Sequence, residues 1–313
     1  MTRAFIFPGQ GAQTIGMGRA LADAYPAARA VFAEVDEALG ENLSALIWDG
    51  EIETLTLTRN AQPALMATSL AAMAALKAEG VDITAASFVA GHSLGEYSAL
   101  AAAGALSLSD TARLLRLRGE AMQAAVPAGE GAMAAVLGLD LAAVEEVAAE
   151  AAQGEVCEAA NDNDPAQVVI SGAKAAVERA CDIAKARGAK RALLLPVSAP
   201  FHCALMQPAA DAMAQALSEV DIEAPAVPLV GNVIARAESS AMLIRNNLVE
   251  QVTGRVRWRE SVAWMAAEGV TEVFEIGAGK ALSGMVKRID RAVATQAVGA
   301  PDDVAAAVAA ING

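Results

Sequence analysis

Short apolar runs alternate with helical periods along most of this chain. An apolar run at Ala4–Phe7 is followed by the loop PGQGAQ, and a second run at Ser87–Ala90 leads into a helix from Leu94. Helical spacing covers three further stretches, at Pro26–Leu39, Pro63–Ala78 and Ser109–Ala125. Strands that alternate with helices in this way predict an α/β architecture.

Two helix starts carry specific signals. Pro63 suits the first turn of its helix, where a missing N–H costs nothing. Ser109 is placed to cap the helix that ends before Pro127.

The rhythm changes after the turn-rich segment VPAGEG. There follow the strand AMAAVLGL, a helix at Leu141–Ala152, the strands EVCEAA and QVVISG, a helix at Ala175–Arg187 and the strand RALLLPV. This strand, helix, two strands, helix, strand order is typical of a ferredoxin-like subdomain. Beyond Pro200 the α/β rhythm resumes, with a strand at Thr271–Ile276 leading into GAGKAL. We therefore predict a catalytic α/β domain at 1–126 and 199–313, with an inserted subdomain at 127–198.

Composition excludes several classes of protein. The hydrophobic fraction is 55% over 313 residues, but alanine supplies much of it and no run approaches the roughly 18 apolar residues of a membrane span. MTRAFIFPGQG is too short for a signal-peptide core, so we expect a cytoplasmic protein. The formal charge of −14 disfavours nucleic acid as a partner. Three cysteines without CxxC spacing indicate free thiols rather than disulfides or zinc.

A serine lies between two glycines at residues 91–95, within FVAGHSLGEYSAL. The pattern G-x-S-x-G between a strand and a helix is typical of a nucleophile elbow, in which the glycines relieve crowding and the serine Oγ is exposed. A serine that only caps the helix would need no glycine on either side. We favour Ser93 as a nucleophile, with the backbone N–H of Leu94 as the natural oxyanion donor.

Such a serine needs a base, and the chain has only two histidines. His92 is adjacent to Ser93, and adjacent side chains rarely point at each other, so we interpret it as a packing residue of the turn. His202 follows a predicted strand, where α/β sheets place their chemistry, and is the preferred base. The orienting group stays open between an acid and a main-chain carbonyl. The aspartates between the serine and the histidine are Asp110, Asp140, Asp162, Asp164 and Asp182.

Six motifs then carry a resemblance to a known family. They are FPGQGAQ, GHSLGEYSAL, LRLRGEAMQ, GAMAAVLGL, PVSAPFH and EIGAGKAL. Their order resembles that of the malonyl-CoA:acyl carrier protein transacylases over essentially the whole chain. The resemblance implies an α/β-hydrolase-like domain with a ferredoxin-like insert. It also implies transfer of malonyl from malonyl-CoA to the phosphopantetheine thiol of acyl carrier protein, through an ester on Ser93 and without a cofactor, for fatty acid synthesis.

The resemblance further implies roles for individual residues. His202 acts as base and then as acid, and the main-chain carbonyl of Gln251 orients it. The backbone amides of Gln10 and Leu94 form the oxyanion hole. Arg118 binds the malonyl carboxylate.

The role of Arg118 also makes physical sense, because a planar guanidinium holds a carboxylate through two parallel hydrogen bonds. From the helix pattern alone, however, it would belong to a solvated face with Arg113 and Arg116.

Three further residues match positions near the family's pocket. Gln62 and Asn161 fit turn or cap roles equally well. Phe201 precedes the histidine, where some relatives carry serine, and in related polyketide synthase acyltransferase domains a phenylalanine there accompanies malonyl rather than methylmalonyl.

Two other functions share some of these features. A serine hydrolase or thioesterase would need the elbow and the histidine but not Arg118. A non-catalytic carrier-binding scaffold would need neither Ser93 nor His202.

We expect a monomer that meets its acidic carrier protein through locally gathered positive charge. Lys190 and Arg191 end the insert, and Lys287 and Arg288 follow the GAGK turn, so these four residues are the predicted carrier-docking patch. Each cluster is otherwise an ordinary solvated face.

Overall fold

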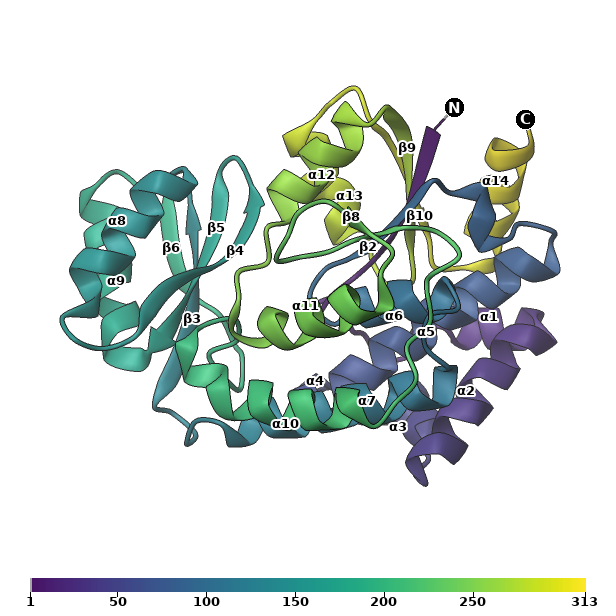
Figure 1. The fold of residues 1–313 in the computed structure, drawn as a ribbon, viewed down its shortest axis with the longest axis horizontal. Coiled ribbons are helices and arrows are strands. Elements are labelled where there is room, and N and C mark those ends of the chain that lie inside the picture. The colour runs from purple at the N-terminus through teal and green to yellow at the C-terminus, as the bar shows by residue number, and fades with distance from the viewer. Residues whose placement is uncertain (1) are drawn as a thin grey trace.

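The computed structural model describes residues 2–313, in which strands and helices alternate over most of the length (Figure 1). The strands are β1 (Thr2–Phe7), β2 (Phe88–Gly91), β3 (Gly131–Leu137), β4 (Cys157–Asp164), β5 (Gln167–Ala173), β6 (Arg191–Leu194), β7 (Leu229–Val230), β8 (Ala237–Glu238), β9 (Val270–Ile276) and β10 (Ala294–Val298). The helices that precede β3 are α1 (Arg19–Ala24), α2 (Pro26–Leu39), α3 (Leu43–Asp49), α4 (Ile52–Thr56), α5 (Thr58–Ala78), α6 (Gly95–Ala102) and α7 (Leu108–Ala124). The later helices are α8 (Leu141–Ala152), α9 (Lys174–Ala186), α10 (Gln207–Ser218), α11 (Ala241–Thr253), α12 (Trp258–Ala267), α13 (Ala281–Ile289) and α14 (Pro301–Asn312). Short 3-10 turns occupy Ile83–Ala85 and Ala204–Met206.

The larger sheet, as described within residues 2–313, has the strand order β10-β9-β1-β2-β7-β8. Its pairs are parallel except for β7 with β8. The central strand β1 is apolar on both faces, because Phe5 and Phe7 pack into the cluster that includes α5, while Ala4 and Ile6 pack against α12 and α13. A strand that is covered on both faces has a continuous run of apolar residues, which is why the run Ala4–Phe7 predicted a strand. The carboxyl ends of β1 and β2 meet at one edge, and the loops there form the site.

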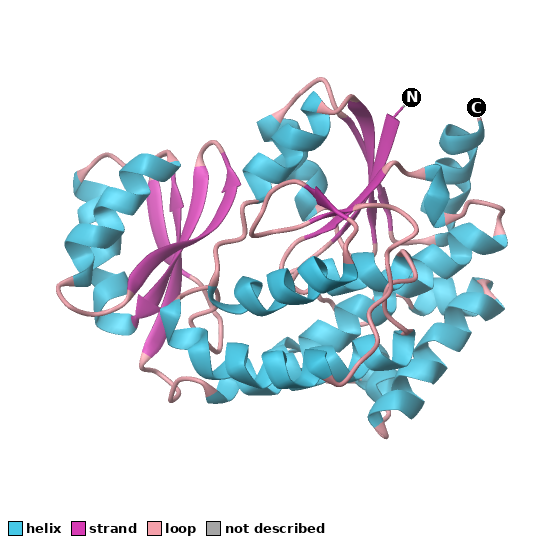
Figure 2. Ribbon diagram, in the orientation of Figure 1, coloured by secondary structure: helices cyan, strands magenta, loops and turns pink. Residues whose placement is uncertain are grey.

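The smaller sheet is antiparallel, with the order β4-β5-β3-β6. Helices α8 and α9 cover one of its faces and share a separate apolar core with it (Figure 2). Its other face, which carries Met133, Ala135 and Val169, borders a cavity next to the larger sheet. The described α/β architecture and the element order of residues 131–194 agree with the prediction from periodicity.

The expected start of the Pro63 helix is wrong. Helix α5 begins at Thr58, and Pro63 lies inside it and is buried. Proline cannot donate to the carbonyl four residues earlier, and this carbonyl, of Arg59, accepts instead from Arg116 Nη1 at 2.9 Å. A partner from another helix therefore satisfies the group that the proline leaves free.

Two other local expectations are corrected. Ser107, not Ser109, caps α7: its Oγ accepts from the N–H of Asp110 at 3.0 Å, while Ser109 Oγ donates to Glu34. The strand expected at EVCEAA continues to Asp164, and the polar side chains that follow are buried. Asp162, Asn163 and Asp164 have partners in Arg259, His92 and Arg288. None of the helices between residues 2 and 313 combines the length and hydropathy that crossing a membrane requires.

Candidate active site

The turn between β2 and α6 is too crowded for any side chain at its two glycines. A Cβ at Gly91 would lie 1.9 Å from the carbonyl carbon of Gly95, and a Cβ at Gly95 would lie 2.2 Å from the carbonyl oxygen of Phe7. Ser93 sits between them with φ of +53°, in the left-handed region that non-glycine residues rarely adopt. Helix α6 has no side-chain cap, so the glycines serve a strained elbow and Ser93 is not a capping residue.

His202 meets the serine from the other wall of the site. Its Nε2 is 2.7 Å from Ser93 Oγ, and its Nδ1 is 2.9 Å from the main-chain oxygen of Gln251. A carbonyl can only accept, so Nδ1 carries the proton and Nε2 is free to accept from the serine hydroxyl. Burial and then the charge of Arg118 lower the pKa of His202 to about 3, which keeps the imidazole neutral at physiological pH. Its φ of +57° is again left-handed.

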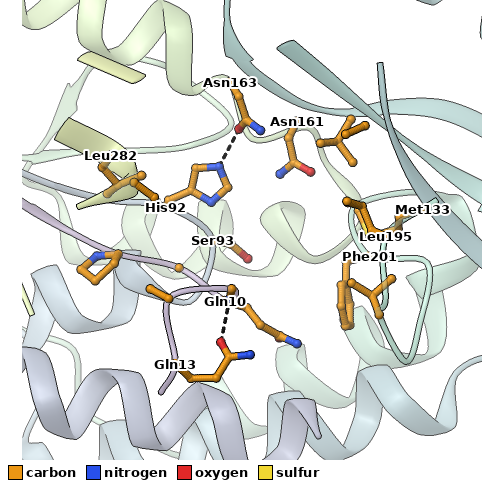
Figure 3. A pocket seen from close by; sticks show the side chains of 18 of the residues that line it. Gln10, Gln13, His92, Ser93, Met133, Asn161, Asn163, Leu195, Phe201 and Leu282 are labelled. Carbon is orange, nitrogen blue, oxygen red and sulfur yellow. Dashed lines mark hydrogen bonds between the residues drawn. The ribbon is translucent and has the colours of Figure 1, made fainter. Parts of the chain in front are cut away.

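The five candidate aspartates are all engaged away from His202. Asp110 contacts Ser107 and Arg113, Asp140 caps α8, Asp162 pairs with Arg259, Asp164 pairs with Arg288, and Asp182 pairs with Lys185. The geometry therefore matches the alternative of a histidine oriented by a main-chain carbonyl. The second histidine, His92, packs in the turn as expected, with its Nε2 2.8 Å from Asn163 Oδ1 (Figure 3).

Two backbone N–H groups near the nucleophile have no partner among residues 2–313. Neither Gln10 nor Leu94 donates its backbone N–H to any acceptor within residues 2–313. Gln10 follows β1 and borders the same cavity as Ser93 (Figure 3), and Leu94 opens the first turn of α6. Free donors from a loop and from a helix start are what an oxyanion hole requires.

Arg118 lies behind the serine rather than on a solvated face. It is 1% exposed, and its guanidinium donates to Gln62 Oε1 at 2.7 Å, Gln251 Oε1 at 2.8 Å and Ser93 Oγ at 3.2 Å. Its Nε has no hydrogen-bond partner, and no acidic side chain of residues 2–313 forms an ion pair with it. Burial lowers the pKa of Arg118. The Glu96 carboxylate interacts with this charge only from beyond ion-pair distance. A buried cation without a direct carboxylate partner is costly, so an anion from outside the chain is the natural direct partner.

A cavity of about 560 Å³ opens in front of Ser93 and His202, between the two sheets. Figure 3 shows Asn161, Met133, Leu195 and Phe201 on the side of the smaller sheet. Gln62 does not border this cavity; it is buried beneath it, where it joins Arg118 to Thr58. No group of three or more His, Cys, Asp or Glu side chains in the described part of the chain could hold a metal ion.

Sequence reasoning missed Asn232, which holds the elbow in place. Its Oδ1 accepts from the N–H of Ser93 at 2.8 Å, and its Nδ2 donates to the carbonyl of Gly91 at 2.6 Å. Only a fold-level contact could reveal this, because 139 residues separate Asn232 from Ser93.

The four basic residues predicted to dock a carrier differ in availability. Lys190, Arg191 and Lys287 are exposed, whereas Arg288 donates to the buried Asp164 at 2.7 Å. In the pairing of β3 with β6, Leu193 lies opposite Ala135, which borders the cavity. Arg191 lies opposite Leu137, two residues further along each strand. Opposed residues two apart share a face of the sheet, so Arg191 lies on the cavity side.

Comparisons with known proteins match this chain to acyltransferases over nearly its whole length. A family described as acyl transferase domain matches residues 4–288. The malonyl CoA-acyl carrier protein transacylases of Bacillus subtilis and Escherichia coli are 49% and 48% identical, each over 97% of this chain and over 96% and 98% of their own lengths. The structure of an acyl-carrier-protein S-malonyltransferase from Bartonella henselae superposes with a TM-score of 0.98 at 54% identity, over all of both chains. A malonyl-transacylase in complex with a type II polyketide synthase acyl-carrier protein is also similar, with a TM-score of 0.96 at 45% identity, over 99% of this chain and all of the other.

Proposed function

The chain belongs to the acyl transferase domain family, and on this premise we propose that Ser93 and His202 carry its reaction. The chain is an acyltransferase that moves a malonyl group from malonyl-CoA to acyl carrier protein, as the names of relatives identical at nearly half of their positions indicate. The observation that carries the assignment to malonyl is the buried Arg118, a cation that touches the nucleophile and has no acidic partner in residues 2–313.

In the first half-reaction, Ser93 Oγ attacks the thioester carbonyl of malonyl-CoA while its proton passes to His202 Nε2, 2.7 Å away. The backbone N–H groups of Gln10 and Leu94 donate to the oxyanion of the tetrahedral intermediate. The carbon–sulfur bond then breaks, and His202 returns the proton to the leaving CoA thiolate. The product is a malonyl ester on Ser93 and free CoA.

The second half-reaction reverses these steps with a different thiol. His202 takes the proton of the phosphopantetheine thiol, and the thiolate attacks the ester carbonyl of the malonyl-serine. The ester bond breaks, Ser93 Oγ regains its proton from His202, and malonyl-acyl carrier protein leaves. The carbonyl of Gln251 keeps the imidazole in the tautomer that both halves need, without an acid.

Arg118 selects the acyl group. The malonyl carboxylate is one methylene away from the ester carbonyl, and Arg118 Nη2 is 3.2 Å from Ser93 Oγ, so a folded-back malonyl brings its carboxylate to the guanidinium. The malonyl carboxylate supplies a direct ion-pair partner for Arg118, whereas an acetyl group supplies none. Phe201 and Asn161 border the cavity on the opposite side, where they limit the room for a branched acyl group.

Several finer assignments belong to the same proposal. The order β4-β5-β3-β6 supports a ferredoxin-like subdomain at 127–198, inserted into a hydrolase-like domain at 1–126 and 199–313. Lys190, Arg191, Lys287 and Arg288 form the carrier-docking patch, with Arg288 contributing less because Asp164 already pairs with it. We further propose that the protein is a cytoplasmic monomer without a cofactor. Its partners are the CoA thioester and the carrier protein, and not nucleic acid or a membrane.

Intact-protein mass spectrometry after mixing with malonyl-CoA tests the proposal. We expect a malonyl adduct on Ser93 that persists until holo-acyl carrier protein is added and then moves to the carrier. Ser93→Ala is the matched control and should form no adduct. Rapid release of free malonate would instead indicate a hydrolase or thioesterase, and the absence of an adduct on the wild-type protein would indicate a carrier-binding scaffold.

A further inference from the structure

A buried carboxylate lies beneath the nucleophile and has no role in the steps above. Glu96 is in the first turn of α6, three residues after Ser93, and is 1% exposed. Its Oε2 accepts from Gln251 Nε2 at 2.6 Å and from the N–H of Asn232 at 3.4 Å. Its Oε1 has no hydrogen-bond partner in the described part of the chain. Keeping a carboxyl group in such a place is costly unless it serves a specific contact.

That contact is with Gln251, to which both His202 and Arg118 are bonded. The main-chain oxygen of Gln251 accepts from His202 Nδ1 at 2.9 Å, and its side-chain Oε1 accepts from Arg118 Nη2 at 2.8 Å. The Nε2 end donates to Glu96 and also to the main-chain oxygen of Ser93, at 2.9 Å. One glutamine thus touches the nucleophile's backbone, the base and the acyl-binding cation.

The two ends of a glutamine amide are chemically different, so its orientation matters. An ionised carboxylate can only accept, so Glu96 pairs with the NH₂ end of Gln251 and leaves the oxygen end for Arg118. If the amide of Gln251 were flipped, its NH₂ group would face the Arg118 guanidinium, and both groups are donors. Its oxygen would then face the Glu96 carboxylate, and both groups are acceptors. Burial raises the pKa of Glu96 to about 7, while the hydrogen bonds from Gln251 and Asn232 and the charge of Arg118 oppose this rise. The neutral carboxyl group of Glu96 keeps one carbonyl oxygen that can still accept from Gln251 Nε2.

We propose that Glu96 is a positioning residue that fixes the amide orientation of Gln251, and through Gln251 aligns His202 for proton transfer and Arg118 for the malonyl carboxylate. This inference rests on the proposed function and adds an acid that acts on the glutamine rather than on the histidine. No acidic side chain in the described part of the chain contacts His202, but Glu96 contacts Gln251, which in turn contacts His202.

The test compares Glu96→Leu, Glu96→Gln and the control Asp162→Asn, which alters another buried carboxylate, paired with Arg259 away from Ser93. Single-turnover acylation of Ser93 by malonyl-CoA and by acetyl-CoA is measured per folded molecule, together with Tm. We expect Glu96→Leu to slow malonyl acylation by about 10- to 100-fold, as when a group that orients a metal ligand is removed. Its preference for malonyl over acetyl should also fall, because Arg118 loses its alignment.

Glu96→Gln can present either an oxygen or an NH₂ to Gln251, so we expect a smaller loss of about three- to tenfold. The control should stay within about twofold of wild type. A malonyl preference unchanged in both Glu96 variants would overturn the proposal, since loss of the Arg118 alignment affects malonyl alone, whereas a merely structural role lowers Tm or slows both donors equally.

A double-mutant cycle decides the question if Glu96→Leu fails to fold. Gln251→Met keeps the main-chain carbonyl that holds His202 but removes the amide. In that background, Glu96→Gln should have no further effect on acylation, whereas fully additive losses would contradict the proposed coupling. Wild-type protein that forms no malonyl adduct would instead overturn the proposed function itself.

Discussion

Removing the Arg118 guanidinium should separate the malonyl reaction from the acetyl reaction. Arg118 is 1% exposed and donates to Gln62, Gln251 and Ser93 but to no carboxylate within residues 2–313. In the acylated enzyme we expect the malonyl carboxylate to complete a buried charge pair. Losing one partner of such a pair costs about 2–5 kcal/mol. Arg118→Ala should therefore slow malonyl acylation by about 30- to 4,000-fold, at about 1.4 kcal/mol for each factor of ten.

The acetyl reaction places no charge beside residue 118, so its loss should be much smaller. The same substitution leaves the Oε1 atoms of Gln62 and Gln251 without their partner, at about 1–3 kcal/mol each in folding stability. Stability is therefore measured alongside the rates, by denaturant unfolding, and rates are expressed per folded molecule. The contributions of fold and of substrate are thereby kept apart.

The assay is stopped-flow or quenched single-turnover acylation of Ser93 with each donor. Arg113→Ala is the matched control: it removes an exposed arginine from the same helix, and both donors should react as with wild type. Equal losses for malonyl and acetyl in Arg118→Ala would refute the reasoning and assign Arg118 to the support of the fold.

Four further predictions follow from the geometry. Asparagine at each of the five candidate aspartates should leave acylation within a few-fold of wild type, whereas loss of a true triad acid costs about 10⁴-fold. Because the pKa of His202 is lowered from 6.5 to about 3, only the unfolded chain takes up this proton between those pH values. The free energy of unfolding should therefore fall as the pH falls through that window, and less so in His202→Asn, as urea titrations at pH 7 and 5 would show. Ser107→Ala should cost about 0.5–2 kcal/mol of stability, because it removes the cap of α7, and Ser109→Ala much less. Reversing Arg191 and Lys287 to glutamate should slow transfer to the carrier severalfold while malonylation by malonyl-CoA is unchanged; equal slowing with free pantetheine would exclude a docking role.

Local pattern predicted much of the fold and named several residues that the structure brings together. Helices α2 and α8 have the bounds that periodicity predicted, since each buries one face and ends at a clear change of pattern. The elbow was recognisable from its five-residue pattern, although only the crowding at Gly91 is local, since a side chain at Gly95 would meet Phe7 of β1. The choice of His202 needed only the scarcity of histidines and the end of a predicted strand.

The predicted bounds were wrong where a residue distant in the sequence supplies a hydrogen-bond or ion-pair partner. Pro63 reads as a helix start, but Arg116 satisfies the carbonyl that the proline leaves free, so the helix extends back to Thr58. The predicted strand ended with EVCEAA, but the polar residues that follow extend β4, because Arg259, Arg288 and His92 pair with them.

Tertiary structure alone decided the polar network behind the nucleophile. Sequence spacing left Arg118 on a solvated face, and only the packing of α7 against α5 buries it next to Ser93. Asn232 and Gln251 reach the elbow across 139 and 158 residues, and Glu96 gains its partner from the second of these. Periodicity reports which face of an element is buried, because burial depends on the element's own side chains. The identity of a polar partner depends on which elements the whole fold brings together, and no local pattern contains that information.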